Sequence, residues 1–261
     1  MNYYALVLFI KAATSLPFNL IVSGSTDATT NQFPYHVSMM NQLGDDSLEF
    51  LCSGAIIDST HVVTTASGAQ INGIQLTSSI RILSGSNELD FTKATSHQIS
   101  SYKLHNNYIP KTFENDIVIF EVTPQFTFSG STNSITVSNN WTADISVDCV
   151  ISSFAEPISD FQDGISSTLK YENIVTSGCS VATNNSFCIA DKTTGKQTTD
   201  KNDTGSPVSC NSRLVGLSTS SPNAIVTNVT AFYDWIKEAT ATTTTAPTTS
   251  PQQPTTAPPA T

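Results

Sequence analysis

Positive charge is scarce in this 261-residue chain, which carries 11 lysine and arginine residues against 21 aspartate and glutamate residues. Only two of the cations are arginines, Arg81 and Arg213, and the lysines form no run. The formal net charge of −10 argues against nucleic acid and against anionic membrane surfaces as partners. An acidic balance alone does not identify the partner that the chain does bind.

Long apolar runs are also lacking, and no stretch approaches the roughly 20 residues that span a bilayer. Residues 3–10 are apolar and small residues follow at 13–15, a pattern typical of a signal peptide cleaved after Ser15. Lys11 follows this stretch instead of preceding it, so a buried N-terminal strand is the alternative. With residues 1–15 as a signal peptide, the chain is expected to be secreted and extracellular.

The cysteines are odd in number, and in a secreted chain this indicates two disulfides and one leftover thiol. The five are Cys52, Cys149, Cys179, Cys188 and Cys210. Cys179 and Cys188 are close enough in sequence to close a small loop. No metal site is predicted, because no histidine stands near a cysteine pair at ligand spacing, and no cofactor is expected.

Helical periodicity is nearly absent from the body of the chain. Short runs rich in β-branched residues, such as 61–65 and 117–120, alternate with Gly, Asn, Asp and Ser turns. Strands at this spacing predict an all-β barrel or sandwich. One helix is expected late in the chain, from apolar residues three or four apart: Val229, Phe232, Tyr233 and Ile236.

Charged and large apolar side chains disappear near the end, where residues 240–261 contain only Thr, Ala, Pro, Ser and Gln. Such a segment cannot offset its ordering entropy by burial. Threonine and serine with proline are typical of an O-glycosylated, mucin-like stalk in a secreted protein. We therefore expect residues 239–261 to be a disordered tail, with an unmodified linker as the alternative.

Four segments, in order, resemble the trypsin/chymotrypsin family of serine proteases across residues 21–238. They are IVSG at 21–24 with QFPYHVS at 32–38, CSGAII at 52–57 leading to VVTTASG at 62–68, NDI at 115–117, and NDTGSP at 202–207. The family reads IVGG and QFPYQVS, CGGSLI and VLTAAHC, NDIAL, and GDSGGP at these places. The resemblance implies two antiparallel six-stranded β-barrels with a C-terminal α-helix, and it makes residues 16–20 a short pro-segment.

The resemblance also assigns the catalytic triad, and two of its three positions have changed chemistry. Ser67 replaces the histidine base, Thr204 replaces the serine nucleophile, and only Asp116 is retained. A serine hydroxyl cannot accept a proton near neutral pH, so Thr204 would remain a weak nucleophile. In subtilisin, loss of the base or the nucleophile costs about 10⁶ in turnover. None of the four histidines aligns with this site.

Further family positions are altered around the triad. Asn202 stands where the first oxyanion-hole glycine is expected, and Thr198 stands at the base of the specificity pocket, where an acidic group would select Lys or Arg. In the family, a new N-terminus at Ile21 would pair with Asp203. Because Leu20 precedes Ile21, trypsin-like processing is not expected, although a chymotrypsin-like enzyme could cut there.

The family positions also suggest how the cysteines and sequons are used. The implied disulfides are Cys149–Cys210 and Cys179–Cys188. The usual partner of Cys52 is Gly68 here, which leaves Cys52 either a buried free thiol or an intermolecular link. N-glycosylation is expected at three sequons and not at a fourth, Asn202, which overlaps the nucleophile segment. The three are Asn140, Asn184 and Asn228.

These features predict a secreted, non-catalytic serine protease homologue, a pseudoprotease glycoprotein. It would act through its loops on a protein partner, which could be a protease, a substrate or a matrix component, in an oligomeric state that the sequence leaves open. One alternative is an unusual serine-type endopeptidase in which another group activates Thr204. The other is a structural mucin-like extracellular glycoprotein whose tail carries the function.

Overall fold

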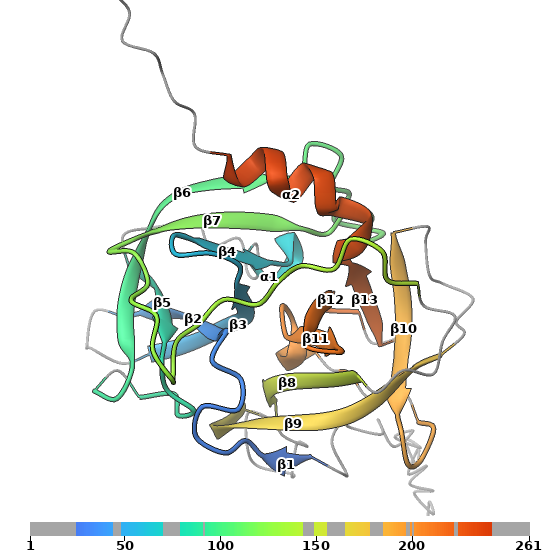
Figure 1. Cartoon of the computed structure of the whole chain (residues 1–261), viewed down its shortest axis with the longest axis horizontal. Helices are drawn as coiled ribbons and strands as arrows, with labels where there is room; N and C mark the ends of the chain where they lie inside the picture. The colour runs from blue at the N-terminus through green and yellow to red at the C-terminus, as the bar shows by residue number, and fades with distance from the viewer. Residues whose placement is uncertain are drawn as a thin grey trace, which may run out of the picture.

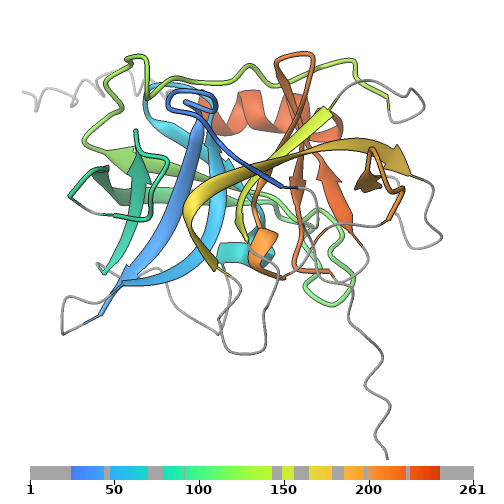
Figure 2. The same ribbon diagram turned by 90° about the horizontal axis from the view of Figure 1, so that it is seen from below.

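The computed structural model describes residues 25–43, 48–69, 79–90, 92–142, 149–155, 165–177, 185–196, 199, 201–221 and 224–241. The expected signal peptide, the pro-segment and most of the expected tail lie outside these residues. Within them the chain forms two closed barrels that lie side by side (Figures 1 and 2). In Figure 2 the blue-to-green strands of the first barrel stand beside the yellow-to-orange strands of the second.

The first barrel closes six antiparallel strands in the order β2-β3-β4-β7-β6-β5. Pairing of β5 with β2 completes the ring. Its interior is filled by fully buried side chains such as Ile56, Ile82 and Phe120, as expected from β-branched and aromatic residues on the inner face. The strands are β2 (His36–Gln42), β3 (Leu48–Ile56), β4 (His61–Thr64), β5 (Ile80–Ser84), β6 (Thr95–Leu104) and β7 (Val118–Thr123).

The second barrel has the order β9-β10-β13-β12-β11-β8, and pairing of β8 with β9 closes it. A short strand, β1 (Thr26–Asp27), adds to the edge of β9. Ile174, Ile189 and Val208 are among the side chains buried in its core. The strands are β8 (Cys149–Ala155), β9 (Ile165–Ser177), β10 (Ser186–Asp191), β11 (Pro207–Cys210), β12 (Arg213–Ser218) and β13 (Ile225–Asn228).

A shared hydrophobic core joins the two barrels. Val63 and Ile117 from the first barrel pack in one cluster with Phe154 and Leu217 from the second. The phenol of Tyr35 donates a 3.1 Å hydrogen bond to Ser209 Oγ across this interface, and burial raises the pKa of Tyr35 to about 12. The barrels are therefore held together mainly by apolar contact, with a few satisfied polar groups inside it.

The last element in the described residues is a helix that crosses the outside of the first barrel above β7 (Figure 1). It starts as a 3-10 turn, η3 (Val229–Phe232), in which Asn228 Oδ1 accepts the N–H of Thr230, and continues as α2 (Tyr233–Thr240). Ile236 is its buried anchor. In the parts of the chain that the structure describes, no helix is long and apolar enough to cross a membrane.

The all-β prediction with a late helix is thus confirmed, as is the pair of six-stranded barrels. Two shorter helices were not anticipated: α1 (Ala66–Ala69) and the 3-10 helix η2 (Lys201–Asp203). Both overlap segments that the family resemblance had singled out for the catalytic positions, 62–68 and 202–207.

Truncation inside the first barrel should cost far more stability than truncation at its surface. We expect Phe120→Ala, at a fully buried position, to lower the free energy of unfolding by about 3–5 kcal/mol because it leaves a cavity. Phe128→Ala, at a side chain 44% exposed, is the matched control and should change it by less than about 0.5 kcal/mol. Urea unfolding followed by circular dichroism measures both, and equal losses would contradict this view of the core.

Candidate functional site

Ser67 and Asp116, the expected base and carboxylate positions, form one closely bonded pair. Ser67 lies in α1, directly after β4, and its Oγ donates a 2.6 Å hydrogen bond to Asp116 Oδ2. The backbone N–H of Ser67 donates to Asp116 Oδ1 at 2.7 Å. Asp116 is fully buried and follows Asn115, whose positive φ of 55° turns the chain into β7. Both carboxylate oxygens are therefore engaged by a single residue.

Burial dominates the electrostatics of this carboxyl. It raises the pKa of Asp116 from 3.8 to about 6, against the lowering effect of hydrogen bonds from Ser67 and the backbone of Ala66. Burial likewise raises the pKa of the nearby Cys52 thiol to about 12, and the charge of Asp116 adds to that rise. Cys52 is thus a protonated thiol at neutral pH, which is the unreactive form.

Thr204, expected at the nucleophile position, is fully buried. It follows η2, and its carbonyl accepts the N–H of Ser53 at 2.9 Å. The next residue, Gly205, has φ of +77°, and a Cβ there would lie 2.0 Å from the carbonyl oxygen of Ser53. This segment is therefore pressed against β3, and only glycine fits at position 205.

The space beside Gly68 connects the expected nucleophile position to the free cysteine. A Cβ built on Gly68 would lie 3.0 Å from Cys52 Sγ and 3.0 Å from Thr204 Cγ2. Cys52 is a buried free cysteine whose Sγ lies 4.0 Å from Thr64 Oγ1. The methyl group that distinguishes threonine from serine therefore borders the space that a cysteine side chain at position 68 would occupy.

All four histidines are engaged away from this pair. His36 bonds Ser152 Oγ at 2.9 Å, His97 lies between Ser84 Oγ and the carbonyl of Pro124, and His61 bonds Asp58. His105 packs its ring against Phe232 and Trp235. None of these contacts brings an imidazole to Ser67 or Thr204, in line with the alignment.

Comparison with known proteins agrees with this geometry. Residues 21–236 match the family model described as Trypsin. The chain belongs to the trypsin family. Among curated relatives, a trypsin of Xenopus laevis is 24% identical over 226 residues, covering 83% of this chain and 86% of the relative. The human protein named Serine protease 1 is 24% identical over 259 residues, covering 92% and 99%.

Solved structures also share this chain's fold. Human heparin binding protein superposes with a TM-score of 0.67 at 21% identity, covering 83% of this chain and 96% of that one. A mutant of the same protein gives a TM-score of 0.69 at 22% identity with the same coverage. At such identities the likeness concerns the fold alone.

The remaining trypsin-family positions divide between the described residues and those outside them. Asp203 is buried and Asn202 is half-buried at the start of the nucleophile segment. Ile21, the expected partner of Asp203, and Thr198, expected in the specificity pocket, lie outside the described residues. Among the described residues, no group of three or more His, Cys, Asp or Glu side chains is placed to hold a metal ion.

Four of the five cysteines lie in the described residues, and their bonding agrees with the trypsin-family positions. Cys149 and Cys210 form a disulfide between directly opposed positions of β8 and β11. Cys188 is also disulfide-bonded, and its expected partner, Cys179, lies outside the described residues. Cys52 is free and fully buried, so in the folded chain its sulfur has no access to a second molecule.

The three expected glycosylation sites differ in their surroundings. Asn140 is exposed, whereas Asn228 is half-buried and uses its side chain to cap η3. Asn184 lies outside the described residues. Of the two sites that can be compared, Asn140 is the one that offers a free side chain to a glycan.

Sequence reasoning missed the contact between Thr204 and the space beside Gly68. It treated Thr204 only as a weak nucleophile, whereas the structure buries the residue completely. The sequence did hold a signal for this contact. Gly68 replaces a family cysteine and Thr204 replaces the family serine in the same chain. Only the three-dimensional packing makes them neighbours.

The raised pKa of Asp116 should appear as a pH dependence of stability. Its folded pKa of about 6 lies above the ordinary 3.8, so its contribution is full below pH 3.8 and is lost as the pH rises through about 6. Asp116→Asn removes this loss. We expect the unfolding free energy of the variant, relative to wild type, to rise by up to about 3 kcal/mol from pH 4 to pH 7. Urea unfolding at both pH values tests this, and parallel changes in the two proteins would contradict it.

The packing around Gly68 predicts that two substitutions will be coupled. In Gly68→Cys a disulfide with Cys52 becomes possible after small shifts, but the methyl of Thr204 crowds the new side chain. Adding Thr204→Ser removes that methyl. We expect the double variant to form the disulfide fully and to be about 1–3 kcal/mol more stable than Gly68→Cys alone.

Thiol titration of the denatured, unreduced protein measures whether Cys52 has reacted. Thr204→Ser alone is the control, and it should retain the free thiol. Strictly additive stability changes in the cycle would show that Thr204 and Gly68 do not share this space.

Proposed function

We propose that this chain is a secreted, non-catalytic member of the trypsin family that acts by binding a protein partner. The observation that carries the proposal is the pairing of Ser67 with Asp116. A hydroxyl that donates its proton to the buried carboxylate stands where proton transfer requires an imidazole. The full burial of Thr204 adds to it, because a buried hydroxyl cannot reach a scissile carbonyl.

The chemistry of acyl transfer explains why this pairing argues against catalysis. The base must take the proton of the nucleophile and return it to the leaving group, which needs a pKa near neutrality. Asp116 has such a pKa, but both of its oxygens are bonded to Ser67. A relay from Thr204 through Ser67 to Asp116 would still leave Thr204 enclosed by Cys52 and Gly68.

The disulfides support an extracellular site of action. Cys149 is bonded to Cys210 and Cys188 is bonded as well, and such bonds persist in oxidising compartments. The Thr/Pro-rich composition of residues 240–261 fits the same environment. We therefore keep secretion as part of the proposal.

The partner is proposed to be a protein and not a polyanion. The two structural neighbours are named for heparin binding. A net charge of −10, with 11 basic against 21 acidic residues, opposes binding of a sulfated, negatively charged chain. Heparin binding is therefore not carried over to this chain.

Active-site labelling tests the absence of catalysis. We expect the secreted full-length chain to remain unlabelled by a reactive fluorophosphonate, before and after chymotrypsin treatment, because Ser67 stands at the base position and Thr204 is fully buried. Thr204→Val, which keeps the branched shape and removes the hydroxyl, should behave like wild type in a broad peptide-hydrolysis panel.

Active trypsin, labelled under the same conditions, is the positive control, and circular dichroism verifies that the chain is folded. Stoichiometric labelling at Thr204, or turnover that Thr204→Val abolishes, would reverse the proposal.

A further inference from the structure

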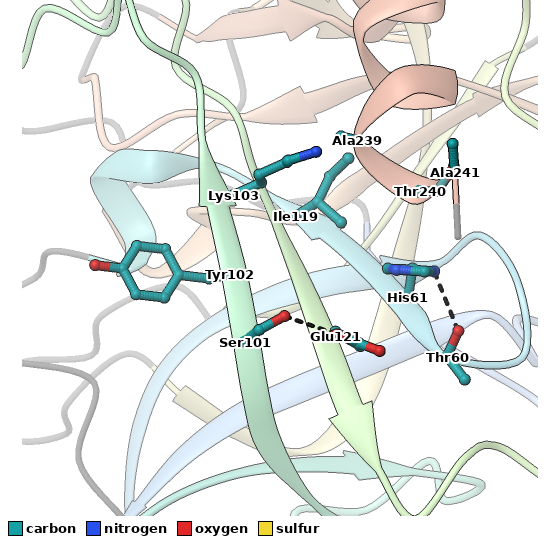
Figure 3. A pocket seen from close by; sticks show the side chains of 10 residues that line it. All are labelled: Thr60, His61, Ser101, Tyr102, Lys103, Ile119, Glu121, Ala239, Thr240 and Ala241. Atoms are coloured by element: carbon teal, nitrogen blue, oxygen red, sulfur yellow. Dashed lines mark hydrogen bonds between the residues drawn. The ribbon is translucent and has the colours of Figure 1, made fainter. Parts of the chain in front are cut away.

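A polar cavity of about 590 Å³ lies between three strands of the first barrel and the last turn of α2 (Figure 3). Strands β4, β6 and β7 form its floor, and Ile119 is its main buried apolar contact. The expected triad positions are not part of its lining. The lining residues that carry polar side chains are Thr60, His61, Ser101, Tyr102, Lys103, Glu121 and Thr240.

Strand register places three of these side chains in one row. Ser101 on β6 is directly opposite Glu121 on β7, and Glu121 is directly opposite His61 on β4. Opposed residues share a face of the sheet, with Cβ atoms about 4.5–5.5 Å apart. Ser101 Oγ donates a 2.7 Å hydrogen bond to Glu121 Oε2. In this row Glu121 therefore stands between a residue with a hydroxyl group and a residue with an imidazole.

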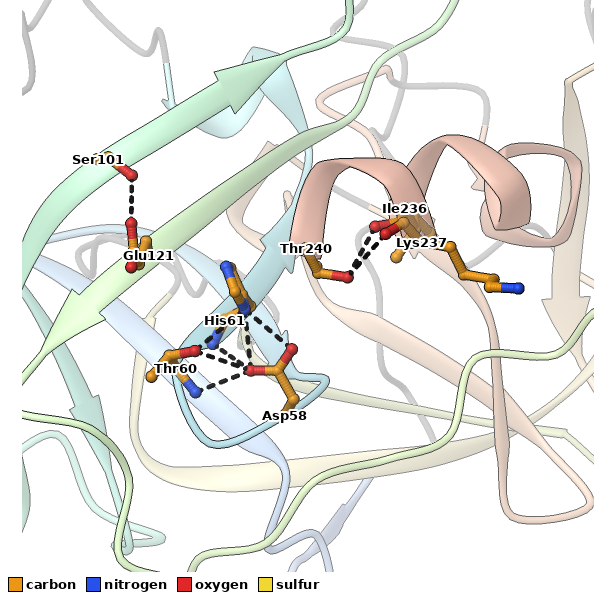
Figure 4. Close-up of polar contacts among 8 residues, drawn as sticks. All are labelled: Asp58, Thr60, His61, Ser101, Glu121, Ile236, Lys237 and Thr240. Carbon is orange, nitrogen blue, oxygen red and sulfur yellow. Dashed lines mark hydrogen bonds and ion pairs between the residues drawn. The ribbon is translucent and has the colours of Figure 1, made fainter. Parts of the chain in front are cut away.

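Asp58 fixes the His61 ring by binding its Nδ1 atom. Its carboxylate oxygens lie 2.9 Å from His61 Nδ1, and Oδ1 also accepts the backbone N–H groups of Thr60 and His61 (Figure 4). The His61 side chain is only 15% exposed. A carboxylate on Nδ1 keeps the proton there, which leaves Nε2 as the lone-pair nitrogen. In Figure 4 that nitrogen points away from Asp58.

The row thus presents two electron-pair donors, His61 Nε2 and the Glu121 carboxylate, on one face beside a solvent-sized space. Imidazole nitrogen with carboxylate oxygen is a ligand set that Zn²⁺ accepts. A carboxylate on the far nitrogen of the histidine is the supporting arrangement found around such ligands. Glu121 is exposed, so its side chain can turn toward His61 at little cost.

We propose that His61 and Glu121 bind a divalent transition-metal ion such as Zn²⁺, with Asp58 as the positioning residue and water in the remaining coordination positions. Two protein ligands make this a weaker site than a cluster of three or four. The proposal is independent of the proposed function, since none of these residues takes part in the Ser67–Asp116 pair.

The positively charged side chain of Lys103 disfavours binding of a metal cation in this cavity. Its ammonium runs toward Ala239 in the last turn of α2 and away from Glu121 (Figure 3), where the carbonyl end of the helix favours a positive charge. It still lines the same cavity. Lys103→Gln should therefore tighten metal binding a few-fold, because it removes a like charge without touching a ligand.

Calorimetric titration of the full-length chain with Zn²⁺ at neutral pH tests the site. We expect one Zn²⁺ per chain, and at least tenfold weaker binding in His61→Gln and in Glu121→Gln. Asp58→Asn should also weaken binding about tenfold, although both ligands remain. His105→Gln, which removes a histidine packed elsewhere, is the matched control and should bind as wild type does.

Mg²⁺ distinguishes this site from a diffuse acidic surface, because Mg²⁺ prefers oxygen ligands and should not compete. Absence of Zn²⁺ binding, binding unchanged by His61→Gln and Glu121→Gln, or equal binding of Mg²⁺ would each overturn the proposal. If His61→Gln does not fold, Glu121→Gln decides the matter alone, since Glu121 lies at the surface.

Discussion

The close approach of residues 203–206 to the first barrel is the constraint on which the site depends. This segment enters β11 of the second barrel, yet its Thr204 carbonyl is bonded to the N–H of Ser53 in β3. Gly205 leaves no room for a side chain against the carbonyl of Ser53. The two barrels are thereby fixed relative to each other at the place where the expected triad positions meet. This contact uses the backbone of Thr204, so it does not depend on whether the Thr204 hydroxyl reacts.

Retention of Asp116 without a histidine has a physical reason in the fold. A buried carboxylate is costly unless its oxygens are hydrogen-bonded. Ser67 supplies one donor from its side chain and one from its backbone. Its small hydroxyl therefore satisfies the carboxylate that an imidazole would otherwise contact, and the interior stays intact. The buried carboxylate of a trypsin-family domain is thus kept without the histidine.

Strand and helix periodicity are local properties, and they predicted the all-β class and the late helix. The resemblance to the trypsin family implied the two six-stranded barrels, which the structure confirms. Sequence reasoning expected a strand over residues 61–65, and β4 ends at Thr64 because Ala66 already begins α1. The burial of Thr204 and the row of His61 and Glu121 were beyond it. Both depend on which distant strands become neighbours when the barrels close, and one residue of register would undo either.

The sealed position of Cys52 has a consequence for the dynamics of the chain. Its thiol is free, fully buried and protonated at neutral pH. A thiol-specific reagent can reach it only during moments when the surrounding strands separate. The rate of its alkylation therefore reports how often the first barrel opens by local unfolding, without any label having to be introduced.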